Sequence, residues 1–196
     1  SLRSTIDSAA SGDTIVLDGS LSGAIFTLTT GELVLDKDLL IVGLGGSNTA
    51  INANGLSRIF RVDSGVTAEV RGYTLALGFA GGTGEGANGG GIYNAGNLEL
   101  TDVKLLGCTA DSLGGGIYST GNLSASTTVI KNGSAQKGGG VYAGGGFLGL
   151  FGFKVEDNTA SQGGGLWLGG STATLTEGLV DRNDALLDGG GIYTAA

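Results

Sequence analysis

The chain has 196 residues, 42 of them glycine, with no proline, methionine or histidine, and its 18 acidic and 10 basic residues give a net charge of −8. Because the ten bases are scattered, this composition argues against nucleic acid or an anionic membrane as a partner. The lack of histidine excludes a Ser-His-Asp triad, a Cys-His dyad and any histidine metal site.

The opening residues predict a short amphipathic helix that covers one end of the fold. Leu2, Ile6 and Ala9 or Ala10 recur at helical spacing, and the following Ser-Gly pair ends the pattern. A stack of repeats requires such a cap, since an uncovered first layer would leave a row of backbone groups unpaired.

From Asp13 onward, short apolar runs alternate with Gly, Asn, Asp and Ser, a pattern typical of strands joined by turns. In the irregular part, strands are predicted at residues 14–18, 25–29, 32–35, 39–42, 50–53, 59–62 and 68–77. A Gly-rich stretch follows at 81–88. Its spacing from Gly84 to Gly89 matches the dinucleotide-binding Gly-x-Gly-x-x-Gly motif, but that motif requires a helix after it. A β-type Gly-Ile-Tyr-Asn follows instead, so we interpret the stretch as an inserted flexible loop.

The most regular feature is a glycine triplet followed by an aliphatic and an aromatic residue, which occurs five times. The triplets begin at Gly89, Gly114, Gly138, Gly163 and Gly189. Repetition at this period indicates a stack of equivalent units. Three strands are predicted in each of four units: 90–94, 97–101 and 103–106; 115–119, 123–126 and 128–131; 139–143, 148–151 and 153–156; 164–168, 173–176 and 179–182.

Three short strands in one repeat can trace a roughly triangular coil, whose strands pair in parallel with those of the next coil. Alternation places one set of side chains inside: Ile92, Leu98, Leu100, Val103 and Leu105. It places Glu99, Asp102 and Lys104 outside. Seven such coils would form a body about 35 Å long at ~4.8 Å per strand.

Equivalent positions in successive coils are expected to stack. Five aromatics share one outward slot: Tyr93, Tyr118, Tyr142, Trp167 and Tyr193. Another slot holds Cys108, Gly133, Asn158 and Asn183, where the asparagines should bond neighbouring backbone and the lone cysteine should be a small buried residue. Apolar residues are also predicted at outward positions: Tyr73, Phe147, Phe151 and Leu186.

These features together resemble the right-handed parallel β-helix repeat proteins of bacterial surfaces, including polymorphic outer-membrane protein passengers. Residues 1–15 look like the Cys-Ser-Leu-Arg-Glu-Ala cap segment of such proteins. Residues 153–160, followed by the triplet at Gly163, are similar to the Phe-x-x-Asn and Gly-Gly-Ala-Ile pair of that family. The resemblance implies the fold and export, and says little about function.

The predicted fold class is all-β: a single-domain right-handed parallel β-helix of about seven three-strand coils with a short N-terminal capping helix. The expected parts of this one domain, residues 1–196, are the cap (1–12), irregular coils (13–80), the Gly-rich loop (81–88) and regular coils of about 25 residues (89–196).

Two enzyme classes are alternatives to a structural role. A polysaccharide lyase would need aspartates that hold calcium and a nearby base, for which the sequence offers Glu156 with Asp157, or three aspartates (Asp181, Asp184 and Asp188) with Arg182. A glycosidase would need two facing carboxylates, and nothing in the sequence selects a pair. Solvated carboxylates in turns are the simpler interpretation.

The predicted function is that of a secreted or surface-displayed bacterial β-solenoid, structural or adhesive, which assembles with itself into homo-oligomers or filaments. Unpaired strand edges in the last coil are expected to invite another copy. The alternative is a polysaccharide lyase or hydrolase, or a carbohydrate-binding β-helix.

The expected contact face consists of the five stacked aromatics with Phe147 and Phe151. No catalytic residue, metal or cofactor is predicted. Self and glycans are the expected partners, without nucleic acid or membrane insertion, because the longest apolar runs (39–44 and 147–153) are too short to span a bilayer.

Overall fold

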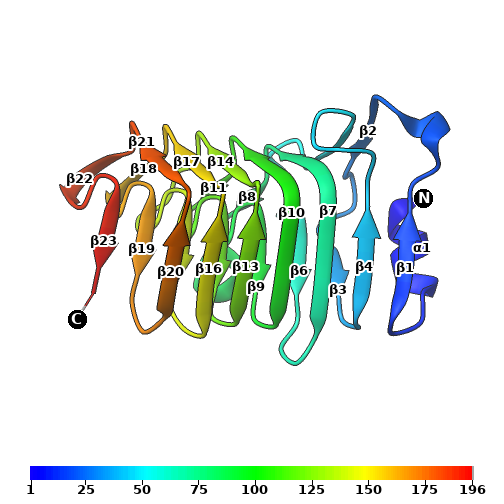
Figure 1. The fold of residues 1–196 in the computed structure, drawn as a ribbon, viewed down its shortest axis with the longest axis horizontal. Coiled ribbons are helices and arrows are strands. Elements are labelled where there is room, and N and C mark those ends of the chain that lie inside the picture. Colours follow the sequence, from blue (N-terminus) through cyan, green and yellow to red (C-terminus); the bar gives the residue numbers. More distant parts are fainter. Residues whose placement is uncertain (196) are drawn as a thin grey trace.

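Short strands that pair with the equivalent strands of the neighbouring turns build this fold, which a computed structural model describes over residues 1–195. Every strand pairing in these described residues is parallel. The chain therefore winds into a parallel β-solenoid of about seven turns (Figure 1). The predicted all-β solenoid is confirmed.

One sheet of 12 strands covers two sides of the solenoid. Its main path, called the long face below, runs through β1 (Asp13–Val16), β4 (Leu39–Val42), β7 (Thr67–Ala76), β10 (Asn97–Leu106), β13 (Asn122–Ser126), β16 (Phe147–Phe151) and β20 (Thr172–Thr176). β7 and β10 bend and continue onto a second side. That side also contains β2 (Ala24–Thr27), β5 (Thr49–Asn52), β14 (Val129–Lys131), β17 (Lys154–Glu156) and β21 (Leu179–Asp181).

A seven-stranded sheet forms the third side. It consists of β3 (Leu33–Leu35), β6 (Phe60–Val62), β9 (Ile92–Asn94), β12 (Ile117–Ser119), β15 (Val141–Ala143), β19 (Leu166–Leu168) and β23 (Ile192–Thr194). Two short pairs between the second and third sides were not predicted. They are β8 (Phe79–Ala80) with β11 (Thr109–Ala110), and β18 (Thr159–Gln162) with β22 (Asp184–Asp188).

The predicted N-terminal helix is confirmed as α1 (Leu2–Ser8), which ends two residues earlier than expected. Ser1 and Ser4 form a reciprocal capping box at its start. Leu2 and Ile6 are buried against the end of the core. The helix is tied to the solenoid by Arg3, which donates to the backbone carbonyls of Gly31 and Glu32, just before β3. None of the described helices could cross a lipid bilayer.

Left-handed backbone conformations recur at the same corners of successive turns. Between the long face and the second side, positive φ angles occur at Gly72, Asp102, Thr127, Gly152 and Glu177. These residues occupy one position of the register, because their neighbours pair directly from turn to turn. Stacking in parallel register thus imposes one corner geometry on every turn, including on residues that disfavour a positive φ.

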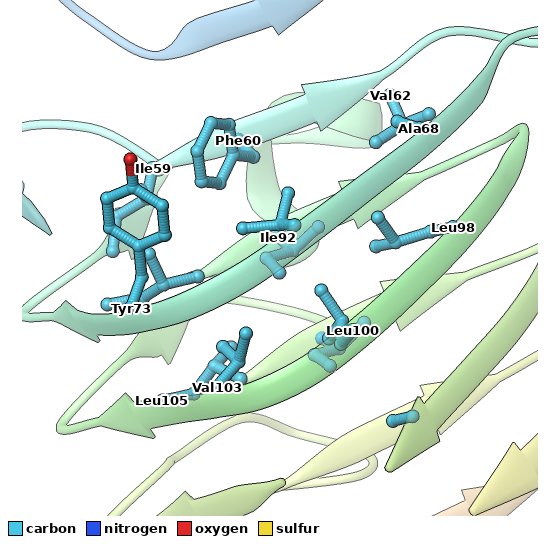
Figure 2. Close-up of a cluster of buried hydrophobic side chains, with 14 of the residues drawn as sticks. Ile59, Phe60, Val62, Ala68, Tyr73, Ile92, Leu98, Leu100, Val103 and Leu105 are labelled. Carbon is cyan, nitrogen blue, oxygen red and sulfur yellow. The ribbon is translucent and has the colours of Figure 1, made fainter. Parts of the chain in front are cut away.

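The inward side chains form one continuous hydrophobic core, and Figure 2 shows its central part. All five residues that alternation predicted to be inside are buried. Of the apolar side chains expected outside, Phe147, Phe151 and Leu186 are exposed, but Tyr73 is fully buried, so that prediction is wrong. The left-handed Gly72 resets the alternation, and Tyr73 therefore points inward like Val103, with which it pairs. Burial raises the pKa of the Tyr73 hydroxyl to about 12.

The predicted asparagine stack is present. Asn158 is buried, donates from Nδ2 to Ile130 O (3.1 Å) and Asn183 Oδ1 (2.9 Å), and accepts from Gly133 N at 2.8 Å. Its amide thus links three consecutive turns. Cys108, in the same slot two turns earlier, is buried as predicted, and burial raises the pKa of its thiol to about 11. These side chains satisfy backbone groups that the corner would otherwise leave unpaired.

The second glycine of the first four triplets lies in close contact with the backbone of the next turn. A Cβ atom on Gly115 would lie 2.5 Å from Ser134 N and 2.6 Å from Ser134 O. Both obstacles are backbone atoms of the next turn, which cannot move without breaking the ladder. Only glycine therefore fits at this position.

We predict that Gly115→Ala lowers the free energy of unfolding by about 3 kcal/mol, because overpacking against a fixed backbone is costly. Urea denaturation measures this change. Gly86→Ala is the matched control, since its nearest obstacle lies 3.5 Å away, and it should have little effect. Equal effects of the two changes would contradict this account of the triplet.

Candidate functional site

The five predicted aromatics form a continuous stack on the outside of the third side. The distances between successive ring centroids, from Tyr93 to Tyr193, are 5.0, 5.3, 4.3 and 6.2 Å. The aliphatic residue before each ring points inward; Ile92 and Leu166, for example, are fully buried. The structure therefore brings together all five ladder residues, here called the aromatic stack: Tyr93, Tyr118, Tyr142, Trp167 and Tyr193.

The faces of these rings are already occupied by neighbours. Each inner ring is sandwiched between two others, with interplanar angles of 25° or less. The Arg58 guanidinium lies 5.2 Å from the Tyr93 ring centroid, and the Lys137 ammonium lies 5.2 Å from that of Trp167. Tyr93 and Trp167 are buried. Because a ligand that stacks on an aromatic ring needs a free face, this geometry favours a stabilising role for the aromatic stack.

We predict that Tyr142→Ala destabilises the protein about twice as much as Tyr193→Ala. Tyr142 stacks on two rings, whereas Tyr193 stacks on one at the longest centroid distance. Each stacked pair contributes about 0.5–1.5 kcal/mol beyond burial of area, so Tyr142→Ala should cost about 2 kcal/mol. Thermal and urea unfolding, followed by the fluorescence of the single Trp167, measure both variants. Similar losses would show that stacking is not what stabilises the rings.

Phe147 and Phe151, predicted as part of the same contact face, lie instead on the long face. They are the first and last residues of β16 and are 41% and 50% exposed. Leu148 and Leu150, between them, point into the core. Gly149 separates the two rings on the outside, and together they frame a shallow groove that also contacts Glu99 and Ser124. The residues predicted to form one contact face therefore lie on two separate surfaces: the aromatic stack on the third side, and Phe147 with Phe151 on the long face.

The strand that carries these two rings and the strands paired with it on either side contain no charged residue. Nine outward positions of β13, β16 and β20 form this uncharged patch: Asn122, Ser124, Ser126, Phe147, Gly149, Phe151, Thr172, Thr174 and Thr176. Glu99 lies on the next strand, β10, and an ion pair between Glu69 and Arg71 lies on β7. In a chain with a net charge of −8, a patch of this size and composition is suited to an uncharged partner.

The acidic residues considered for an enzyme lie at an exposed corner and form ion pairs. Arg182 Nε lies 2.7 Å from Asp157 Oδ1, and Lys131 Nζ lies 3.0 Å from Asp157 Oδ2. The hydrogen bond from Arg182, followed by that from Lys131, lowers the pKa of the Asp157 carboxyl to about 2. Asp157 is therefore ionised at neutral pH and has no proton to donate. Glu156 and Asp181 also lie beside Arg182.

The aspartates do not assemble into a calcium site. Asp184 and Asp188 lie at the two ends of β22, and Asp188 Oδ2 accepts from Gln162 Nε2 at 3.4 Å. Within residues 1–195, no group of three or more acidic or cysteine side chains is arranged to hold a metal ion.

We predict that the ion pairs of Asp157 make stability depend on acid pH. The folded pKa of about 2 lies below the ordinary value of 3.8, so the stabilisation is complete above about pH 4. It is lost as the pH falls through the folded pKa, near 2. Thermal melts across this range should therefore show a steeper fall in Tm for the natural chain than for Asp157→Asn. Parallel Tm profiles would contradict the assignment.

The Gly-rich loop is held against the solenoid by Arg58, by Asp111, which accepts from Gly82 N, and by Ser112 N, which donates to Ala87 O. It contains a 3₁₀ turn (Gly84–Ala87), and β9 follows instead of a helix, as expected for a chance match to the dinucleotide motif. Arg58 Nη1 donates to Glu85 O and Asn88 O, both at 2.9 Å, and Nε pairs with Glu32 at 2.5 Å. The adjoining hollow is lined by Leu56, Phe79 and Asp111. Because Arg58 is engaged with the loop and with Tyr93, this hollow is best explained as a loop anchor.

No protein-family model, curated protein or solved structure matches this chain. The solenoid fold therefore rests on the structure itself, and the resemblance to bacterial surface repeat proteins remains a prediction.

Sequence reasoning missed the polar part of the patch around Phe147 and Phe151. Ser124, Thr174 and Glu99 are unremarkable in the sequence, and Gly149 looks like one more turn glycine. The sequence signal that could have revealed this patch is the repeat period, combined with the alternation of inward and outward side chains along each strand. These two patterns place Glu99, Ser124, Gly149 and Thr174 at one register position.

Proposed function

We propose that the chain is a structural and adhesive β-solenoid, displayed outside the cell, which associates with a second copy of itself and catalyses no reaction. The sequence resemblance to surface repeat proteins supports display outside the cell. The ion pairs of the acidic corner favour a structural role over a lyase or hydrolase, since Arg182 and Lys131 already occupy the Asp157 carboxylate.

The observation that carries this proposal is an exposed apolar surface on β22 and β23. Leu186 and Leu187, adjacent in β22, are 84% and 71% exposed. Ile192 of β23 is exposed too, although Leu166, its partner one turn earlier, is fully buried. Large exposed apolar surfaces mark interaction sites.

The strands that carry this apolar surface also have unpaired edges in the described residues. In the described residues, β20, β21, β22 and β23 each pair with a strand on one side only. An open strand edge recruits another strand by main-chain hydrogen bonding. A second copy placed by a two-fold axis would present the same edges in antiparallel orientation, and such a contact is self-complementary.

The opposite end of the solenoid does not offer an equivalent surface. There α1 covers the core, with Leu2 and Ile6 buried beneath it. A contact between the apolar surfaces of β22 and β23 on two copies is self-complementary, which favours a dimer over the filament suggested by the sequence. Each copy carries a charge of −8, so repulsion between the copies opposes association.

We predict that the mass measured by light scattering rises from monomer to dimer with protein concentration. Raising the salt concentration from about 0.05 to about 0.5 M should strengthen the dimer by screening like charges. Replacing both Leu186 and Leu187 by serine should raise the dissociation constant at least about tenfold, equivalent to about 1.4 kcal/mol.

Leu56→Ser is the matched control, because Leu56 is 66% exposed but lies far from the last turn in the sequence and beside the Gly-rich loop. This variant should dimerise like the natural chain. A strict monomer at the highest concentration reached would overturn the proposal, as would a dimer that resists the double substitution.

A further inference from the structure

A shallow groove runs along the long face, parallel to the solenoid axis. The parallel register places one residue of each strand in its middle row: Glu69, Glu99, Ser124, Gly149 and Thr174. Two adjoining hollows follow this row and share Glu99 and Ser124. From β7 to β20 the row crosses four strand spacings, or about 19 Å at ~4.8 Å each. The groove is therefore suited to a linear ligand.

Gly149 lies in the middle row of the groove, between the two phenylalanines of β16. A Cβ atom here would lie 2.7 Å from Cε1 of Phe147, so that ring leans along its strand over the glycine. Phe151 stands on the other side of Gly149, in the neighbouring outward position of β16. In contrast to the aromatic stack, neither phenylalanine stacks on another aromatic ring of the described residues. Both rings are available to a ligand.

The polar groups of the groove are the carboxylates of Glu69 and Glu99, several hydroxyls, and the amides of Asn97 and Asn122. Glu99 makes no ion pair within the described residues, and Ser124 and Thr174 offer hydroxyl groups that can donate or accept. The uncharged patch supplies no cation that would hold an anionic ligand. A ligand that fits must donate hydrogen bonds along one edge and lay an apolar face on a ring.

We propose that this groove binds a linear, uncharged oligosaccharide, whose sugar rings stack on Phe147 and Phe151 and whose hydroxyls bond Glu99 and Ser124. Sugars combine an apolar ring face with equatorial donors, as the groove requires. Anionic glycans and nucleic acids are opposed by Glu99 and by the net charge of −8. A peptide strand finds no open backbone here, because each inner strand of the face is paired on both sides.

The test uses the whole chain and hexasaccharides of defined charge, titrated by calorimetry. Neutral cellohexaose and mannohexaose are compared with anionic hexagalacturonate and cationic chitosan hexamer. At least one neutral hexasaccharide should bind, and its disaccharide should bind at least about tenfold more weakly because it fills only part of the groove. Stronger binding of either charged hexamer, or no neutral binding, would overturn the proposal.

Variants locate the site. Replacing Phe147 and Phe151 by alanine should weaken binding of the neutral hexasaccharide at least about tenfold. Gly149→Thr, which fills the floor with a residue favoured in strands, should weaken it similarly. Phe79→Ala is the control, since Phe79 is an exposed phenylalanine lining the separate hollow beside the Gly-rich loop, and it should bind normally. Binding that survives both groove variants would overturn the assignment.

The same experiment separates this site from self-association. The mass of each variant is measured without sugar, and the phenylalanine variant should dimerise like the natural chain. If it loses dimerisation instead, and the natural chain binds no sugar, the groove is a contact between copies and the oligosaccharide proposal is wrong. A chain that binds sugar as a strict monomer would refute only the dimer through the last turn.

Discussion

Parallel backbone pairing between turns, in a register that shifts only at the bulge between β18 and β22 in the described residues, is the constraint on which the rest of this structure depends. Each turn must place its hydrogen-bonding groups at the height of those in the next turn, so every turn repeats nearly the same path. A side chain consequently has its equivalent directly above and below it at the strand spacing. Residues with favourable interactions between like groups, such as rings and amides, are therefore found in rows. The close approach of backbones leaves glycine as the residue that fits the second triplet position.

The same constraint produces two different aromatic surfaces. On the third side, one aromatic occurs in every turn from β9 to β23, and the rings cover one another's faces. On the long face, exposed aromatics occur in a single strand, β16, so Phe147 and Phe151 have small polar neighbours above and below. Repetition of aromatics makes a structural element, whereas their isolation leaves faces free for binding. This difference is why we place the ligand site on the long face.

The charged side chains also separate a structural part of the surface from the part that is available for binding. Ion pairs gather at the corner where Lys131, Asp157 and Arg182 occupy successive turns, and they satisfy one another across the stack. The uncharged patch lies on the long face, away from this corner, although the chain as a whole is strongly acidic. The two ends also differ. An amphipathic helix covers the first turn, whereas the last turn exposes leucines and open strand edges.

The sequence by itself determined the solenoid, the stack of five aromatics, the asparagine row and most strands, because a period of about 25 residues and a two-residue alternation are directly visible in it. The role of Tyr73 depended on the tertiary structure: a left-handed Gly72 reverses the alternation, and its neighbours in sequence do not reveal this. The short strands β8, β11, β18 and β22 were missed because two to five residues carry too little pattern. Whether a ring face is free, and whether Glu99 and Gly149 meet in one groove, is decided by residues a full turn or more apart. Such proximity is a property of the register between turns, which exists only in the folded chain.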